Sequence, residues 1–285
     1  MSTSISTVSP TEITTAVSTQ VRGYLQQGTL QLPPNYSADN ALKSAMLSLP
    51  AVVDANKVPV LKSCTPESIK SALLSMCIQG LNPDKKQCYF IAYGSKLTLS
   101  RSYFGDIAIA KQVDPNIEDV YPVAVFEGDS FAYQIKRGQI VNIDHTQKLE
   151  NKNKPIVAAY ATVVYRNGKE ISTVMTMEQI KQSWKQSQTR PVDANGIVNP
   201  ASTHGKYPEE MAKKTVVHRA CKPIIDSSDD SNLMVQYAKQ SADDADAIEV
   251  GEEIEENANQ TYIDVEPRED VEEPDQTVKT EDDPF

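Results

Sequence analysis

The sequence has few of the residues that build metal sites, disulfide frameworks or membrane spans. Its 285 residues include 4 cysteines and 3 histidines, with no CxxC pair and no closely spaced histidines. This spacing excludes the usual zinc sites, and we expect the cysteines to be buried free thiols. No apolar run approaches the about 18 residues of a membrane helix, and no basic segment followed by an apolar one begins the chain. We therefore expect a soluble cytoplasmic protein.

Signatures of catalysis are missing as well. There is no GxxxxGKS or GxxxxGKT loop, so no machinery for nucleotide-driven work is visible. His145, His204 and His218 are far apart, and no serine or cysteine stands in a recognisable nucleophile context. The Asp-Lys-Lys run at 84–86 contains the Asp-x-Lys fragment of some nucleases, which is short enough to occur by chance. We expect a protein that is not an enzyme and that needs no metal, ATP or other cofactor.

Charge is distributed unevenly along the chain. The net charge is −11, but residues 229–285 contain 20 acidic and 3 basic residues and so have a net charge of −17. The preceding 228 residues therefore have a net charge of +6, which is compatible with a nucleic-acid partner. Beyond Ser227 the sequence loses its periodicity and has few aromatic residues, which is typical of disorder. A short helix over residues 232–242 is compatible with the pattern.

The stretch from Gln79 to Lys111 combines hydrophobic patterning, turn residues and positive charge. Residues 87–93 and 96–101 have the composition of two strands, joined by a turn at Gly94-Ser95. Ser102 then stands where it can cap a short helix. The stretch predicts a hairpin leading into a helix, with cations placed to hold an anion: Lys85, Lys86, Lys96, Arg101 and Lys111.

Helices are predicted before this hairpin. Apolar residues recur at helical spacing over residues 13–25 and again over 41–49. Thr65 is placed to cap a third helix, with Pro66 at its first position and Gly80 at its end. We expect these helices to serve in packing or in subunit contacts.

After the hairpin the pattern changes to strands. Five strand-like runs lie between residues 117 and 175, and Arg137-Gly138 and Asn167-Gly168 are hairpin turns. The composition of the second turn is typical of type I′. The predicted fold class is therefore α+β, an antiparallel β-sheet with packed helices and an acidic disordered C-terminal tail. The polar loop before the fourth run carries three lysines, which form a solvated turn or touch phosphate.

A helix after Thr176 begins with a capping box, because Gln179 follows three residues later. Trp184 lies on the apolar stripe of this helix, where we interpret it as a core residue, with stacking on a base as the alternative. Lys181 and Lys185 stand one turn apart beside the stripe. They form a solvated flank or face DNA.

The last predicted helix is the most basic one. A loop over residues 188–207 carries Arg190 and Lys206, and Pro208 then begins a helix that is expected to end before Pro223. Its basic residues are Lys213, Lys214, Arg219 and Lys222.

Several short motifs occur in one order along the chain. They are the Gln-Gly-Leu-Asn-Pro run at 79–83, Tyr-Phe-Gly at 103–105, Val-Met-Thr at 174–176, Ser-Gln at 187–188 and Glu-Glu-Met-Ala-Lys-Lys-Thr at 209–215. In this order they resemble the phage RecT family of single-strand annealing proteins, over residues 38–225. The family usually has Tyr-Arg-Gly at 103–105, so an arginine contact is not carried over to Phe104.

The resemblance implies a recombination protein that binds single-stranded DNA and anneals complementary strands without ATP. It also implies a homo-oligomer, as a ring or a helical filament on single strands and annealed duplex, in the cytoplasm of a host bacterium. A phage exonuclease is the implied partner. It favours DNA over solvent for the two lysines of the helix after Thr176. An alternative is an interaction adaptor that acts through its acidic tail.

Annealing of any sequence requires contacts to phosphates and to base faces, with the base edges left free. Lysine and arginine suit the phosphates, and Tyr103 and Phe104 are candidates for stacking unless they belong to the core. We divide the chain into an N-terminal helical or flexible segment (1–37), an annealing core (38–228) and the tail (229–285). The candidate DNA-binding residues are Lys85, Lys86, Lys96, Arg101, Tyr103, Phe104, Lys111, Lys181, Lys185, Arg190, Lys206, Lys213, Lys214 and Arg219.

The end of the chain resembles the acidic, Pro-Phe-ending tip of bacterial single-stranded DNA-binding proteins. A terminal phenylalanine can fill an apolar pocket while neighbouring carboxylates pair with basic residues, so this tip can recruit host single-stranded DNA-binding or repair proteins. The tail can instead fold back on the basic body and compete with DNA, or serve only for solubility. The residues of the tip are Asp282, Asp283, Pro284 and Phe285.

Overall fold

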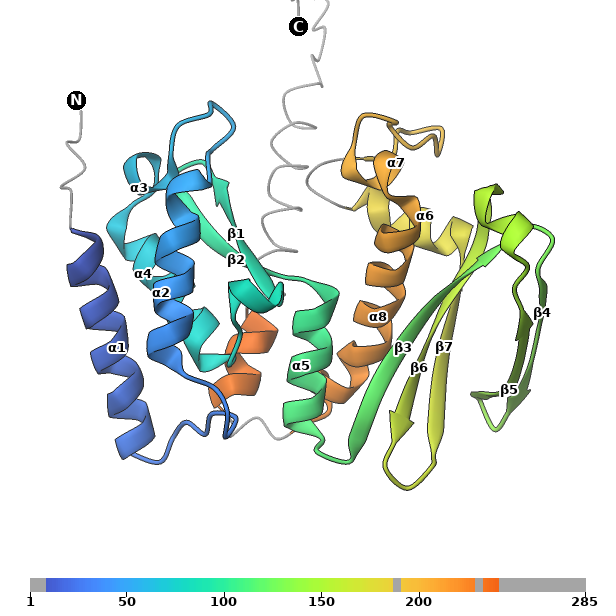
Figure 1. Cartoon of the computed structure of the whole chain (residues 1–285), viewed down its shortest axis with the longest axis horizontal. Helices are drawn as coiled ribbons and strands as arrows, with labels where there is room; N and C mark the ends of the chain where they lie inside the picture. The colour runs from blue at the N-terminus through green and yellow to red at the C-terminus, as the bar shows by residue number, and fades with distance from the viewer. Residues whose placement is uncertain (1–8, 187–190, 229–232, 241–285) are drawn as a thin grey trace, which may run out of the picture.

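Two antiparallel sheets form the framework of the protein, and helices connect and cover them (Figure 1). The structure is a computed structural model that describes residues 9–186, 191–228 and 233–240. The smaller sheet is the hairpin β1–β2, and the larger has five strands in the order β3-β6-β7-β5-β4. The predicted α+β fold is confirmed. The expected disorder of the tail beyond residue 240 lies outside the described residues.

Three helices form the N-terminal part of the protein, and their caps follow the sequence signals. Ser9 caps the helix at Pro10–Gln26 in a capping box with Glu12. The Thr65 hydroxyl accepts a hydrogen bond from an amide in the first turn of the helix at Pro66–Ile78, as predicted. The three helices pack on one another, and the helix at Pro66–Ile78 also packs on the hairpin. They are α1 (Pro10–Gln26), α2 (Ala38–Ser48) and α4 (Pro66–Ile78), with the short η1 (Leu49–Ala51) and α3 (Val60–Ser63) between α2 and α4.

The hairpin and the helix after it occur where they are predicted. After η2 (Pro83–Lys85), strands β1 (Cys88–Tyr93) and β2 (Lys96–Arg101) pair in register, with Tyr93 opposite Lys96. The Ser102 hydroxyl accepts from the amide of Gly105 and so caps α5 (Tyr103–Val113). The polypeptide therefore passes directly from the hairpin into the helix that carries the two candidate stacking rings.

Gly105 has a packing reason to be glycine. It lies in the first turn of α5, and a Cβ atom there would collide with the backbone carbonyl of Gln87. That carbonyl also accepts a hydrogen bond of 3.0 Å from the amide of Ser102, so it is held in place against the helix. The close approach of strand and helix therefore requires a residue without a side chain at this position.

The five-stranded sheet confirms the five predicted strand runs. Its hairpin β4–β5 joins the other strands through one residue pair, Ile140 with Ser172, and diverges from them in Figure 1. The strands are β3 (Ile117–Phe126), β4 (Ser130–Lys136), β5 (Gln139–Thr146), β6 (Ile156–Tyr165) and β7 (Glu170–Thr176), with η3 (Leu149–Asn153) between β5 and β6.

The two predicted hairpin turns differ in type. Arg137 and Gly138 both have a positive φ, of 53° and 77°, which a type I′ turn requires. The type I′ prediction for Asn167-Gly168 is wrong. Both residues are described, but only Gly168 has a positive φ, of 79°. The amide of Gly168 donates to the carbonyl of Tyr165 in a three-residue loop. Such a loop needs only its last residue in the left-handed region.

The helices of the second half are α6 (Met177–Lys185), α7 (Thr203–Lys206) and α8 (Pro208–Asp226). Helix α8 packs on β6, β3 and β7 and also against α5, so it lies between the sheet and the N-terminal part (Figure 1). The expected end before Pro223 is wrong, because the helix continues through it. A proline inside a helix costs about 3 kcal/mol, and the burial of Ile225 together with the core contact of Ile224 offsets this cost.

Helical residues 233–240 lie C-terminal to α8 and pack on the core through Met234, Val235 and Ala238. They fall within the short helix expected over 232–242. Trp184 is also core, as interpreted, since it is 3% exposed and its indole N–H donates to the Thr215 hydroxyl at 2.9 Å. The four cysteines are buried and free, as expected.

We expect Gly105→Ala to lower the free energy of unfolding by about 1–3 kcal/mol, because the new Cβ overpacks the contact with the Gln87 carbonyl. Gly23→Ala is the matched control. Gly23 lies inside α1 with open space around it, so alanine there should raise stability by about 0.5–1 kcal/mol. Urea unfolding of both variants measures the difference, and equal stabilities would contradict the proposed close approach.

Candidate nucleic-acid interface

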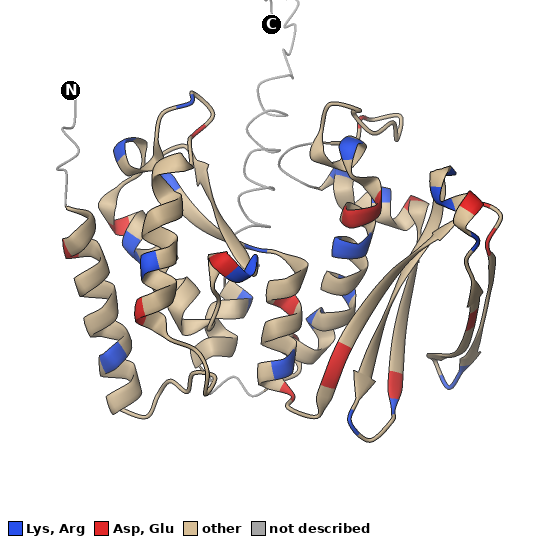
Figure 2. Cartoon of the chain, in the orientation of Figure 1, with Lys and Arg blue, Asp and Glu red and all other residues tan. Residues whose placement is uncertain are grey.

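A groove lined by lysines lies where the segment before β6 meets the starts of α6 and α8. Its volume is about 580 Å³. Tyr207, which is 61% exposed, and Phe126 also line it, so flat apolar rings stand beside the charges. Figure 2 shows acidic and basic segments following one another at the start of α8. We call this site the basic groove, and its cations are Lys152, Lys154, Lys181 and Lys206.

Asp129 holds the loop that supplies two of these lysines. Its carboxylate accepts hydrogen bonds from the Asn151 side chain at 2.8 Å and from the backbone amides of Phe126 and Lys148 at 2.9 and 3.2 Å. Asn151 in turn accepts from the Lys154 ammonium at 2.8 Å. Burial acts to raise the pKa of Asp129, but these hydrogen bonds outweigh it and hold the pKa well below its usual range. The carboxylate is therefore ionised at neutral pH, and the loop is fixed.

Aromatic side chains gather on the other side of α8. The rings of Tyr103 and Phe104 lie 4.1 Å apart at the start of α5, and Phe104 is 46% exposed. Tyr89 points outward from β1, and the Lys214 ammonium donates to its hydroxyl at 2.7 Å and lies 5.5 Å from its ring centroid. We call these four residues the aromatic face. Lys86 lies next to it, because the hydroxyl that caps α5 also donates to the Lys86 carbonyl.

The first turn of α8 connects the groove to the aromatic face. The Lys213 ammonium lies 2.7 Å from Glu209 and 3.3 Å from Glu210, and Lys152 lies 3.8 Å from Glu209. Burial acts to lower the pKa of Lys213, but the two glutamates outweigh it and raise the pKa. The pKa of Tyr103 is raised first by burial and then by the nearby charge of Glu210. Groove and aromatic face therefore form one continuous surface.

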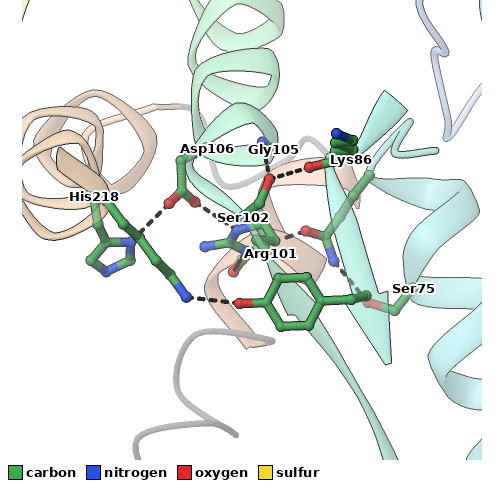
Figure 3. Close-up of polar contacts among 11 residues, drawn as sticks. Ser75, Lys86, Arg101, Ser102, Gly105, Asp106 and His218 are labelled. Carbon is green, nitrogen blue, oxygen red and sulfur yellow. Dashed lines mark hydrogen bonds and ion pairs between the residues drawn. The ribbon is translucent and has the colours of Figure 1, made fainter. Parts of the chain in front are cut away.

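The Arg101 side chain makes its polar contacts within the protein (Figure 3). Its side chain is 9% exposed, and its guanidinium lies 2.9 Å from Asp106 and donates to Gln79 at 3.2 Å and to the Ala238 carbonyl at 2.7 Å. The second carboxylate oxygen of Asp106 lies 3.1 Å from His218 on α8. The network joins β2, α4, α5, α8 and residues 233–240. The network therefore engages the Arg101 guanidinium within the protein.

The same contacts keep Asp106 ionised. Burial acts to raise its pKa, but the hydrogen bond from His218 and the charge of Arg101 outweigh burial and hold the pKa below its usual range. A carboxyl group with a depressed pKa stabilises the fold at neutral pH, and the contribution is lost as the pH falls through the folded-state value.

Four other predicted cations are not among the residues that line the basic groove. Lys96 is at the turn of the hairpin, at the opposite end from Arg101. Lys111 is in the last turn of α5, 3.0 Å from Asp119. The Lys185 ammonium donates to a loop carbonyl at 3.4 Å. Lys85 is exposed in η2.

A second cavity, of about 530 Å³, contains another predicted residue. Arg219 lines it together with Gln179 and Gln182 of α6 and with residues 171–175 of β7. Arg190 lies outside the described residues, as does the tip at 282–285. The structure thus brings together Lys86, Tyr103, Phe104, Lys181, Lys206, Lys213 and Lys214 from the predicted set.

Three aromatic residues of this surface are additions to the predicted set: Tyr89, Phe126 and Tyr207. The signal for Tyr89 is its place in a strand between Cys88 and Phe90, which are both buried. Tyr207 precedes a helix-starting proline and has no comparable signal. Two of the three lysines of the polar loop, Lys152 and Lys154, line the groove.

Within the described residues, no group of three His, Cys, Asp or Glu side chains is placed to hold a metal ion. No helix of that part of the chain is long and apolar enough to cross a membrane. The aspartate of the Asp-Lys-Lys run, Asp84, accepts a hydrogen bond from the Ser44 hydroxyl and so attaches η2 to α2.

Comparison with models of known protein families gave a match over most of the chain. The family model described as RecT family matches residues 39–274. The comparison with curated proteins gave no match. The matched range contains the basic groove and the aromatic face.

We expect Arg101→Ala to lower the free energy of unfolding by about 3–5 kcal/mol, because it leaves the Asp106 carboxylate buried without its partner. Arg22→Ala is the control, since Arg22 pairs with Asp39 at an exposed site, where such a pair contributes about 0–1 kcal/mol. Chemical denaturation measures both. An Arg101→Ala protein of undiminished stability that has lost DNA binding would instead make Arg101 a DNA contact.

Proposed function

The chain belongs to the RecT family of single-strand annealing proteins, and we propose that its basic groove and aromatic face together bind one strand of DNA. The observation that carries this proposal is the continuity of a lysine-lined groove with exposed aromatic rings across the start of α8. Lysines neutralise phosphates, and rings stack on bases whatever their identity. We therefore expect binding with little sequence preference and a strong dependence on salt.

The same arrangement suits annealing. Contacts to phosphates and to base faces leave the hydrogen-bonding edges of the bases available to a complementary strand. Each base-pair step that forms contributes about 1.4 kcal/mol of stacking. Pairing itself therefore supplies the driving force, which is consistent with annealing that needs neither ATP nor catalysis by the protein.

Several copies acting along one strand would extend the annealed region, and we propose a homo-oligomer. Exposed apolar residues at opposite ends of the molecule support it: Leu47, 84% exposed, beside a cavity between α1 and α2, and Ile135, 68% exposed, on β4. Helices α1 and α2 lie toward one end of the long axis in Figure 1, and β4 lies at the other. A contact between such unlike surfaces repeats head to tail and builds rings or filaments.

The proposed setting is recombination in the cytoplasm of a host bacterium, beside a phage exonuclease. Host single-stranded DNA-binding or repair proteins are the partners proposed for the tip at 282–285. The proposal for the tip rests on its sequence alone, because these residues lie outside the described part of the chain.

We expect the variant Lys181→Ala/Lys206→Ala to bind single-stranded DNA more weakly, by about fivefold per lysine at 0.1 M salt. Each lost phosphate contact should also lower the slope of log affinity against log salt by about 0.7. Fluorescence anisotropy with a labelled oligonucleotide over a salt series measures both quantities.

The matched control for these lysines is Lys62→Ala/Lys70→Ala, which removes the same charge from exposed positions on α3 and α4. This control should change neither affinity nor slope appreciably. Equal losses in the two double variants would show that only overall charge matters, and the groove would not be the binding site.

The adaptor alternative is tested by removing residues 241–285, which have a net charge of −16. If residues 1–240 are sufficient to anneal DNA, the shortened protein retains annealing. If the tail competes with DNA, the shortened protein binds more tightly at low salt, and the difference fades as salt screens the charges. Annealing and binding assays on both proteins measure this, and loss of annealing would favour the adaptor.

Deleting only Pro284 and Phe285 separates the roles of the tail. This change leaves its net charge unaltered, so DNA affinity should remain that of the full chain. Loss of recruitment of a host partner with intact DNA binding would support the partner role of the tip.

A further inference from the structure

Two carboxylates lie within the proposed DNA surface. Glu209 and Glu210 line the basic groove together with its lysines, and both lie in the first turn of α8. The Lys213 ammonium contacts both of them, at 2.7 and 3.3 Å, and its side chain is only 21% exposed. Lys152 lies 3.8 Å from Glu209. Two cations that face the strand therefore already have anionic partners from the protein.

A carboxylate and a phosphate oxygen make the same kind of contact with an ammonium group. Both accept short, charge-assisted hydrogen bonds of about 2.7–2.9 Å. The Lys213 ammonium has three N–H donors, and two carboxylates already lie at its contact distance. A phosphate that binds Lys213 must therefore displace at least one carboxylate or share the ammonium with it.

Stabilisation of the helix start does not by itself explain why these glutamates contact lysines. Acidic residues are favourable near a helix N-terminus, and Glu67 has that place in α4, directly after Pro66, just as Glu209 follows Pro208 in α8. Within the described part of the chain, Glu67 makes no ion pair with a lysine. Glu209, by contrast, is contacted by Lys213 and Lys152. The lysine contacts are thus additional to the role that the two helix starts share.

We propose that Glu209 and Glu210 compete with DNA phosphates for Lys213 and Lys152, so that the surface holds a strand reversibly. This inference rests on the proposed function and concerns the same surface. The charge of Glu210 also adds to the effect of burial in raising the pKa of Tyr103, so a phosphate that displaces Glu210 changes the surroundings of a residue of the aromatic face. A strand that is held loosely can shift its register until complementary bases meet, which annealing requires.

The test is the variant Glu209→Gln/Glu210→Gln, which keeps the size of both side chains and removes their charge. Its affinity for a labelled oligothymidine is measured by fluorescence anisotropy over a salt series. Each freed lysine should tighten binding about fivefold at 0.1 M salt and steepen the slope by about 0.7. Dissociation into excess unlabelled oligonucleotide should slow correspondingly, because related complexes differ mainly in their off-rates.

Two comparisons make the result specific. Glu67→Gln removes one carboxylate from the equivalent place in α4 and should leave affinity and slope unchanged. In the background of Lys213→Ala, the gain from the glutamine substitutions should fall from about twenty-five-fold to about fivefold, because only Lys152 remains to be freed. Glu210→Gln alone, at a side chain that is 55% exposed, provides a milder variant should the double one unfold, as judged by circular dichroism.

The outcomes separate this inference from the proposed function. Tighter binding with a steeper slope in the glutamine variant supports competition. If the wild-type protein binds DNA and the glutamine variant binds with equal or lower affinity, competition is overturned while the proposed function stands. If neither protein binds the oligonucleotide, both are overturned.

Discussion

The buried ion pair between Arg101 and Asp106 is the contact on which the rest of the arrangement depends. Two charges withdrawn from water are tolerated only when each is fully bonded, and here Gln79, His218 and the Ala238 carbonyl complete their hydrogen bonds. These three partners lie at the end of α4, on α8 and in residues 233–240. The pair therefore joins the hairpin, α5 and α8, which are three of the elements that carry the candidate interface.

The middle and the first turn of helix α8 lie in different surroundings. Its middle is buried on the sheet through Val216 and Val217, whereas its first turn reaches the solvent between the groove and the aromatic face. There, lysines and glutamates alternate at contact distance, so the surface is neither simply positive nor inert. Such a balance suits a protein that must hold a DNA strand and still release it for pairing.

Local structure followed from the sequence to a large extent, because it depends on neighbouring residues. Capping hydroxyls at Thr65 and Ser102 and alternation in the strands located most elements. The errors arose where tertiary contacts outweigh local preference. Helix α8 passes Pro223 because Ile225 is buried, and the turn at Asn167-Gly168 follows the length of its loop. The candidate site was recovered in part, since spacing cannot show which cations are already paired.

By itself, the sequence determined that a basic body precedes an acidic tail, that the fold is α+β, and that the family is RecT, since composition, periodicity and motif order are properties of the chain alone. Only the tertiary structure decided the environment of each charge. Arg101 and Lys213 look alike as sequence, yet one is enclosed by the core and the other lies between two glutamates at the surface. The physical reason is that the effect of a charge depends on its solvent exposure and its nearest partners, which folding brings together from distant positions.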